Sequence, residues 1–136
     1  MGFTFKKEER LCSRQLIDRL YAEGHRLMAF PYSVQWMTLE SGEPLSHSAT
    51  QVMIVAPKRK FHHAVDRNRV RRLTRECYRL RKHALYDFLQ QHGLTLVFSM
   101  VYIHNEIMSY DQLGHKMDKL LAALQKDILA HQQPTP

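Results

Sequence analysis

The feature that most constrains this 136-residue sequence is a strongly basic segment at its centre, residues 58–82. It holds eleven Lys and Arg residues and only two acids, Asp66 and Glu76, so its formal charge is 11 − 2 = +9. Because the whole chain carries +7, the remainder carries 7 − 9 = −2. Net positive charge alone is weak evidence for a polyanionic ligand, but its confinement to one segment is stronger evidence.

Apolar residues recur every three or four positions in this segment, which predicts a helix with one buried face. They are Val70, Leu73, Cys77, Leu80 and Ala84. Asp66 is expected to cap the helix, and Val65 is expected to contact Val70 as a hydrophobic staple. The predicted helix would pack its apolar face on the rest of the protein.

Arginines at i, i+4 form a ridge on the opposite side of that helix, at about 100° per residue. The ridge consists of Arg67, Arg71, Arg75 and Arg79, with Arg72 and Lys82 at its flanks. Like charges at this spacing oppose helix formation by roughly 0.2–0.5 kcal/mol per pair. A sequence that accepts this cost indicates a densely anionic ligand, and arginine favours bidentate contacts with phosphate. The alternative is a solvated charged face, although such faces usually mix both signs.

The rest of the chain predicts strands and helices around the basic segment. Ser13 and Gly24 are expected to bound a first helix, and Ser109 with Gln112 forms a capping box that opens the last one. Alternating or continuous apolar runs predict strands at residues 30–39, 51–56 and 94–103. The order indicates an α+β fold, with helices packed on a small sheet. We expect residues 1–136 to form a single nucleic-acid-binding domain, ordered from about residue 3 to about residue 130.

The sequence lacks the residue patterns of a self-sufficient enzyme. It has no evident Ser/His/Asp, Cys/His or paired-carboxylate set, and no glycine-rich phosphate loop. Cys12 and Cys77 have no CxxC spacing, so we expect neither a zinc site nor a disulfide, and a reduced cytoplasmic setting is the default. No apolar run is long enough to span a membrane. We therefore expect no catalytic residue, no metal ligand, no membrane partner and no small-molecule substrate.

Residues 57–76 closely resemble the signature of bacterial ribonuclease P protein subunits. The matching positions are Lys58-Arg59 at the end of a strand, Ala64, Arg67-Asn68-Arg69, the pair Arg71-Arg72 and then Arg75. The resemblance extends upstream over the first helix and downstream over the last strand and helix, roughly residues 3–128. It implies an α/β sandwich in the order αβββαβα with a left-handed βαβ crossover, like the second domain of a small-subunit ribosomal protein.

The resemblance also implies a function. The chain would be the protein subunit of ribonuclease P, an endoribonuclease that removes the 5′ leader of precursor tRNA. A large ribonuclease P RNA would carry out hydrolysis with bound Mg²⁺, and the protein would assist by binding that RNA and the leader. Two other functions stay open: a structural or ribosomal RNA-binding protein, and a DNA-binding module. The second is disfavoured because an arginine ridge contacts phosphates more than base edges.

On the family pattern, seven residues would face the catalytic RNA: Lys58, Arg59, Arg67, Asn68, Arg71, Arg72 and Arg75. The leader would lie in a groove lined by Ile17, Tyr21 and Gln35. From the residues alone, Tyr21 has two interpretations. It either packs in the core beside Leu20, which is the commoner case, or offers a ring on which an unpaired base stacks.

Overall fold

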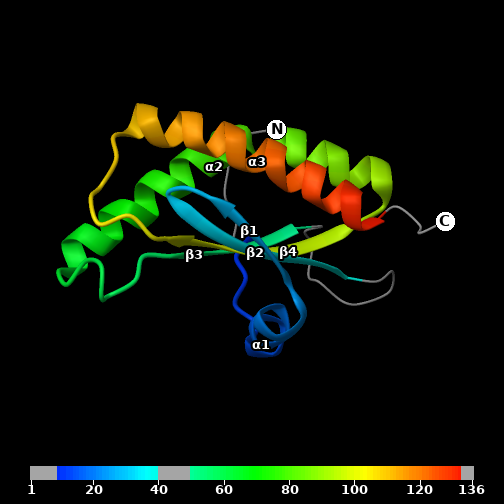
Figure 1. Ribbon diagram of the computed structural model, residues 1–136, viewed down its shortest axis with the longest axis horizontal. Helices are drawn as coiled ribbons and strands as arrows, with labels where there is room; N and C mark the ends of the chain where they lie inside the picture. The colour runs from blue at the N-terminus through cyan, green and yellow to red at the C-terminus, as the bar shows by residue number, and fades with distance from the viewer. Residues whose placement is uncertain (1–8, 40–49, 133–136) are drawn as a thin grey trace.

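A computed structural model of the protein describes residues 9–39 and 50–132. Its elements are α1 (Arg14–Glu23), β1 (His25–Ala29), β2 (Tyr32–Leu39), β3 (Thr50–Val55), α2 (Ala64–His92), β4 (Thr95–Tyr102) and α3 (Tyr110–Gln132). One sheet has α2 and α3 on one face and α1 on the other, which confirms the α+β fold in the order αβββαβα (Figure 1). Residues 3–8 of the expected ordered core lie outside the described ranges.

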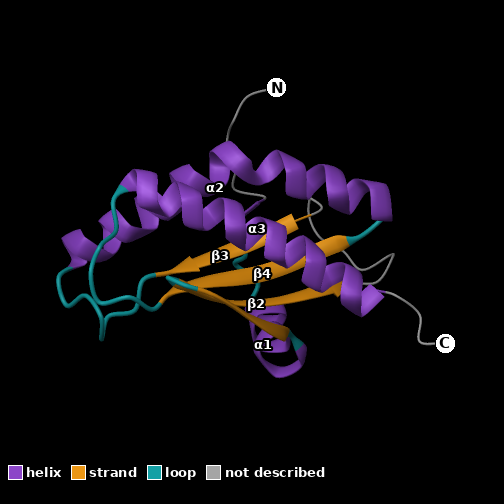
Figure 2. Ribbon diagram, turned by 45° about the horizontal axis from the view of Figure 1, so that its top comes forward, coloured by secondary structure: helices purple, strands orange, loops and turns teal. Residues whose placement is uncertain are grey.

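The four strands lie in the order β1-β2-β4-β3. β2 pairs antiparallel with β1 and with β4, whereas β3 and β4 are parallel and are connected through α2. In Figure 2, where α2 and α3 lie in front of the sheet, the β3–α2–β4 connection turns in the left-handed sense. Only about 2% of such connections do so, so this feature followed from the resemblance and not from general rules.

Alternation of the strand side chains gives the sheet two apolar faces. The face under α2 and α3 carries the larger core, which includes Trp36, Phe98 and Tyr32. On the other face, Leu20 of α1 packs in a smaller cluster with Leu11, Met37, Leu39 and Val97. Because α1 is short, it covers only one end of this face of the sheet. Strand residues further along the same face, such as Gln35 and Val101, are half-buried.

The predicted helix boundaries of α1 and α3 are confirmed. Ser13 Oγ accepts a hydrogen bond from the Leu16 amide at 3.3 Å. The capping box of α3 is complete, because Gln112 N donates to Ser109 Oγ at 3.2 Å and Ser109 N donates to Gln112 Oε1 at 3.1 Å. Gly24 follows α1, and a Cβ there would lie 2.3 Å from the carbonyl oxygen of Leu20. Only glycine fits this close approach.

The start of α2 differs from the prediction. The N-cap is His63, which makes no side-chain capping bond, and Asp66 lies inside the first turn. Asp66 therefore places an anion beside the positive end of the helix dipole instead of capping the helix. Val65 is 77% exposed, so the predicted staple with Val70 is wrong.

The buried face of α2 also departs from the prediction in its second half. Leu80 and Ala84 are exposed, whereas Tyr78, Lys82 and Leu85 are buried. Tyr78 packs edge-on against Phe98 with ring centroids 5.9 Å apart, which fixes the rotation of the helix on the sheet. Lys82, expected at the flank of the arginine ridge, lies inside the protein.

The predicted strand at residues 30–39 is shorter than expected and is preceded by another strand. β1 ends at Ala29, the Phe30–Pro31 peptide is cis, and β2 begins at Tyr32. β1 shows only exposed and half-buried positions, so its residues carry a weak apolar pattern. That weak pattern explains why the alternation of apolar residues does not reveal this strand.

Candidate RNA interface

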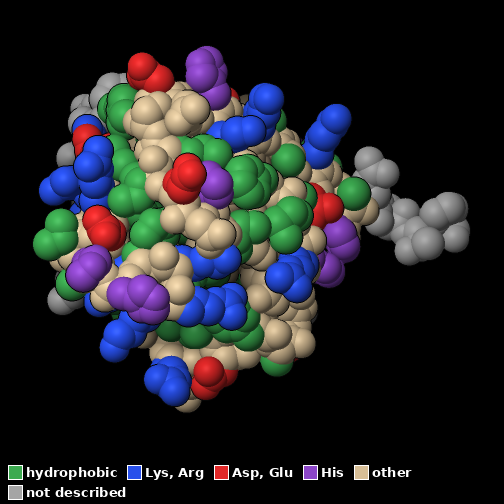
Figure 3. Space-filling model, turned by 60° about the vertical axis from the view of Figure 1, so that its left-hand side comes forward, with side chains coloured by type: hydrophobic (Ala, Val, Ile, Leu, Met, Phe, Trp, Pro, Cys, Tyr) green, Lys and Arg blue, Asp and Glu red, His purple; other side chains and the backbone are tan. Residues whose placement is uncertain are grey.

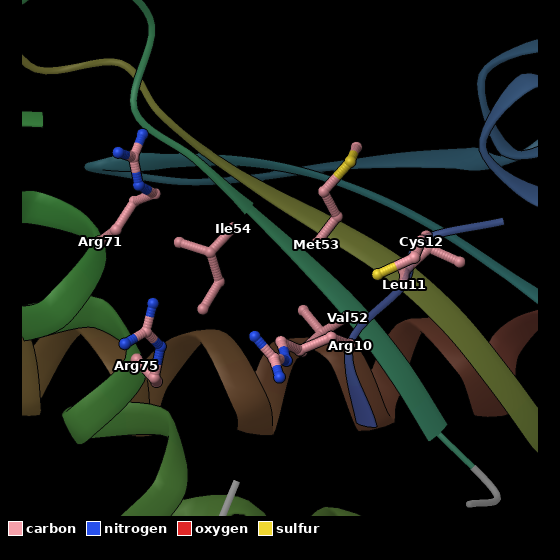
Figure 4. A pocket seen from close by; sticks show the side chains of 8 residues that line it. All are labelled: Arg10, Leu11, Cys12, Val52, Met53, Ile54, Arg71 and Arg75. Carbon is pink, nitrogen blue, oxygen red and sulfur yellow. The ribbon is translucent and has the colours of Figure 1, made fainter. Parts of the chain in front are cut away.

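Three arginines from two distant segments lie beside the outer edge of β3. Arg71 and Arg75 come from successive turns of α2, and Arg10 comes from the N-terminal segment, which forms a parallel bridge with Val52. They line a hollow of about 180 Å³. Figure 4 shows the three side chains arranged around Ile54. We call Arg10, Arg71 and Arg75 the arginine cluster.

The backbone of β3 adds polar groups to this hollow. Leu11 N donates to Val52 O at 2.9 Å, so the N-terminal segment pairs with the first half of the strand edge. Ile54 lies two residues further on and directs its backbone N–H and C=O to the same side. The residues lining the hollow, all within the described part of the chain, include no acid. Guanidinium groups around a hollow with no acid in its lining suit a phosphate group.

The other ridge residues have different partners. Arg67 Nη1 donates to the carbonyl oxygens of Phe61 and His62, both at 2.9 Å, and so holds the loop before α2. Asn68 Oδ1 accepts a hydrogen bond from Arg71 Nη2. Within the predicted set, Arg67 and Asn68 thus bond to neighbouring groups of the protein, while Arg71 and Arg75 line the hollow.

Arg79 differs from the rest of the ridge. Its guanidinium donates to both carboxylate oxygens of Glu76, at 2.8 and 2.9 Å. These hydrogen bonds hold the pKa of the Glu76 carboxyl below its usual value. The charge of Arg79 is therefore balanced locally, and the unbalanced part of the ridge is its N-terminal half.

The remaining predicted contacts of the catalytic RNA are exposed. Lys58 and Arg59 lie in the loop between β3 and α2, and Arg72 lies on α2. They surround the N-terminal part of α2 without entering the hollow of the arginine cluster. Of the predicted set, only Arg71 and Arg75 line the hollow, and Asn68 contacts Arg71 beside it.

Arg10 is the member of the cluster that sequence reasoning missed. It lies outside the basic segment, and nothing in its neighbourhood of the sequence marks it as a binding residue. Its place depends on the bridge to Val52, a contact between residues 42 positions apart. The neighbouring residues Glu9 and Leu11 give no local sign of that pairing.

The three predicted groove residues lie on or beside the α1 side of the sheet. Ile17 is half-buried and packs against the smaller apolar cluster. Gln35 is half-buried and lies two residues from Met37 on the same face of β2. Tyr21 is 46% exposed one helical turn after Ile17, whereas Leu20 is fully buried. Tyr21 is therefore not a core residue.

Within residues 9–39 and 50–132, no group of three or more His, Cys, Asp or Glu side chains could hold a metal ion. In the same ranges, no helix has the length and apolar character needed to cross a membrane.

Comparison with known proteins places the chain in a family. The family model described as "Ribonuclease P" matches residues 5–125. The chain belongs to the ribonuclease P protein family. Family members include the "Ribonuclease P protein component" of Porphyromonas gingivalis strain W83, which is 34% identical over 119 residues, 88% of this chain and 85% of the relative. The protein of the same description from Chlorobium phaeobacteroides is 27% identical over 125 residues, 87% and 86% of the two chains.

Solved structures of family members support the fold. The RNase P protein of Staphylococcus aureus aligns with a TM-score of 0.64 at 18% identity, over 85% of this chain and 94% of that one. The RNase P protein of Thermotoga maritima aligns with a TM-score of 0.62 at 19% identity, over 83% and 94%. The family that the basic segment resembles is confirmed, and so is the α+β fold expected from the order of the elements and from that resemblance.

Proposed function

We propose that this family member is the protein subunit of ribonuclease P and that it binds the RNA subunit through the arginine cluster. The observation that carries the proposal is the convergence of Arg10, Arg71 and Arg75 on one hollow without an acidic lining. Guanidinium forks match the oxygen atoms of a phosphate in pairs. Lys58, Arg59 and Arg72 extend this positive surface, and Arg67 and Asn68 hold its shape.

The 5′ leader of precursor tRNA is proposed to lie on the α1 side of the sheet, past Ile17, Tyr21 and Gln35. The exposed ring of Tyr21 offers a surface on which an unpaired base stacks. The amide of Gln35 offers both donors and an acceptor, which suits a base edge or a ribose hydroxyl. This groove and the arginine cluster give the protein separate contacts for substrate and RNA subunit.

Hydrolysis is assigned to the RNA subunit with bound Mg²⁺, and no residue of this chain is proposed to act on the scissile bond. Mg²⁺ prefers oxygen ligands in octahedral geometry, which RNA phosphates supply. The protein contributes fixed cations where RNA phosphates would otherwise repel one another. The protein should therefore accelerate cleavage by the RNA subunit most strongly at low Mg²⁺ concentration.

The decisive experiment measures removal of the 5′ leader by a ribonuclease P RNA at low Mg²⁺, with and without the protein. We expect the protein to accelerate cleavage, and a variant with Arg10, Arg71 and Arg75 all changed to Ala to lose most of that effect. Lys119→Ala, an exposed cation of α3, is the control and should behave as wild type. Unaccelerated cleavage by a competent RNA would refute the proposal, and tight RNA binding in that case would favour a structural RNA-binding role.

A further inference from the structure

One exposed aromatic side chain takes no part in the interface described above. Phe30 is 48% exposed in the turn between β1 and β2. The centroid of its ring lies 5.1 Å from that of His104, and the two ring planes are inclined by 59°. His104 belongs to the segment that connects β4 to α3, so the pair joins two loops at one end of the sheet. We call Phe30 and His104 the sheet-end platform.

The backbone beneath this platform is held firmly. Ile103 N donates to Pro31 O at 2.8 Å, which ties the end of β4 to the β1–β2 turn. The buried Tyr102 donates through its hydroxyl to Glu106 O at 2.8 Å and accepts from Met108 N at 3.1 Å. Both loops are thus anchored in the core. A platform fixed in this way loses little conformational freedom when it binds a ligand.

The loop before α2 brings cationic side chains to the same end of the sheet. Lys60 Nζ donates to Asn105 Oδ1 at 3.0 Å, which links the loop before α2 to the residue next to His104. Lys58 and Arg59 are exposed in that same loop. The segment at residues 103–109 contains one acid, Glu106. Figure 3, turned so that the loop end of Figure 1 comes forward, shows hydrophobic side chains on this face interspersed with Lys, Arg and His and with several Asp and Glu side chains.

We propose that the sheet-end platform stacks an unpaired nucleotide base of a bound RNA, while Lys58 and Lys60 attract the adjoining phosphates. The proposal rests on the proposed function, because it needs an RNA ligand, and it adds a contact outside both the arginine cluster and the leader groove. An exposed ring binds any base through its π face, and flanking cations hold the backbone. Protein interfaces are instead depleted in lysine, which disfavours a protein partner here.

A tryptophan at position 30 tests the stacking directly. Trp36 is the only native tryptophan and is 1% exposed, so Phe30→Trp adds one exposed fluorophore. We expect a ten-nucleotide single-stranded RNA to quench the added emission, and an RNA duplex of the same length to quench it far less. Leu129→Trp, at a position 37% exposed on α3, is the matched control and should show little quenching. Equal quenching at positions 30 and 129 would overturn the proposal.

Affinity measurements then identify which RNA supplies the base. Phe30→Ala and Phe30→Leu should each weaken binding roughly 5- to 10-fold, and Phe30→Tyr should bind as wild type, because only the ring stacks. A loss seen with the RNA subunit alone assigns the base to that RNA. A loss seen only when the assembled holoenzyme binds precursor tRNA, and not mature tRNA, assigns it to the leader. The proposal would be overturned if the Ala and Leu variants kept wild-type affinity both for the RNA subunit alone and, in the holoenzyme, for precursor tRNA.

The two proposals fail in different ways. If wild-type protein accelerates leader removal but position 30 shows no quenching, the proposed function stands and the platform falls. If cleavage is not accelerated but RNA still quenches the emission at position 30, the platform stands as an RNA contact and the proposed function falls. Urea unfolding of Phe30→Ala checks that the variant is folded. Sedimentation tests whether a second copy of the chain binds this face instead. If Phe30→Ala dissociates a dimer and leaves the affinity for RNA unchanged, the face is a contact between copies of the chain and the proposal is wrong.

Discussion

Lys82 Nζ and Glu9 Oε1 form an ion pair in the protein interior, with the two side chains only 4% and 10% exposed. The hydroxyl of Tyr86 donates to the same carboxylate oxygen at 2.9 Å. The pair joins the N-terminal segment to α2. Because Arg10 follows Glu9 in the chain, the pair also helps to position Arg10 beside the arginines of α2.

Removing the lysine should therefore be costly. Lys82→Met should lower the free energy of unfolding by about 3–5 kcal/mol, because Glu9 is left buried without its counter-charge. Urea denaturation measures the change. Glu9→Gln combined with Lys82→Met should recover much of the loss, since no uncompensated charge remains. A single variant within 1 kcal/mol of wild type would show that Glu9 reaches solvent.

A second long-range hydrogen bond holds α3 on the sheet. Trp36 Nε1 donates to Asp127 Oδ2 at 2.8 Å. Asp127→Ala should reduce the free energy of unfolding by about 1–3 kcal/mol, whereas Asp127→Asn keeps an acceptor and should lose less. Urea unfolding followed by the emission of Trp36 measures both variants. Equal losses for Ala and Asn would mean that the carboxylate charge matters and the hydrogen bond does not.

Stability should fall in alkaline solution. Burial raises the pKa of Tyr32, Tyr78 and Tyr102 above the ordinary value of 10.0. The unfolded chain therefore loses these protons first, so the stability that these tyrosines contribute is fully present below about pH 10 and declines above it. Tyr78→Phe should reduce the decline by up to about 1.4 kcal/mol per pH unit, as measured by urea unfolding between about pH 8 and 11. An unchanged slope would contradict the role of burial at Tyr78.

Salt dependence tests the arginine cluster. Each of Arg10→Ala, Arg71→Ala and Arg75→Ala should lower the slope of log affinity against log salt by about 0.7–0.9 for the RNA subunit, because one phosphate contact is lost. Arg79→Ala is the matched control on α2, since Glu76 already balances its charge, and its effect should be smaller. If all four variants keep the wild-type slope, the arginine cluster makes no phosphate contact and the ridge is only a solvated charged face.

The leader groove has its own test. Tyr21→Ala should weaken holoenzyme binding to precursor tRNA roughly 5- to 10-fold and leave mature tRNA unaffected, because only the precursor carries an unpaired leader. Tyr21→Phe keeps the ring and should bind as wild type. Equivalent losses for precursor and mature tRNA would remove Tyr21 from the groove.

Local signals predicted the parts of the fold that depend on neighbouring residues. The Ser13 cap and the Ser109–Gln112 box were predictable because each involves hydrogen bonds between residues three positions apart. The arginines of α2 were predictable in the same way, from helical spacing. The left-handed crossover has no such local signal, and only the family resemblance supplied it.

Contacts between distant residues account for several of the errors. The burial of Lys82 depends on Glu9, 73 residues away, and helical spacing alone had placed this lysine beside the ridge. Arg10 joined the candidate site through a bridge to β3, and the exposure of Tyr21 depends on how α1 lies on the sheet. None of these three features follows from a local pattern in the sequence, because each depends on segments that meet only in the folded protein.

The outer edge of β3 has one more consequence for the free protein. An open strand edge is a template on which another chain can add a strand and begin to aggregate. Here the N-terminal segment occupies the edge at Val52, and Arg71 and Arg75 stand beside Ile54, where a second copy would bring arginines of its own. The arginines that we propose to bind an RNA phosphate would therefore also oppose the pairing of two identical chains along this edge.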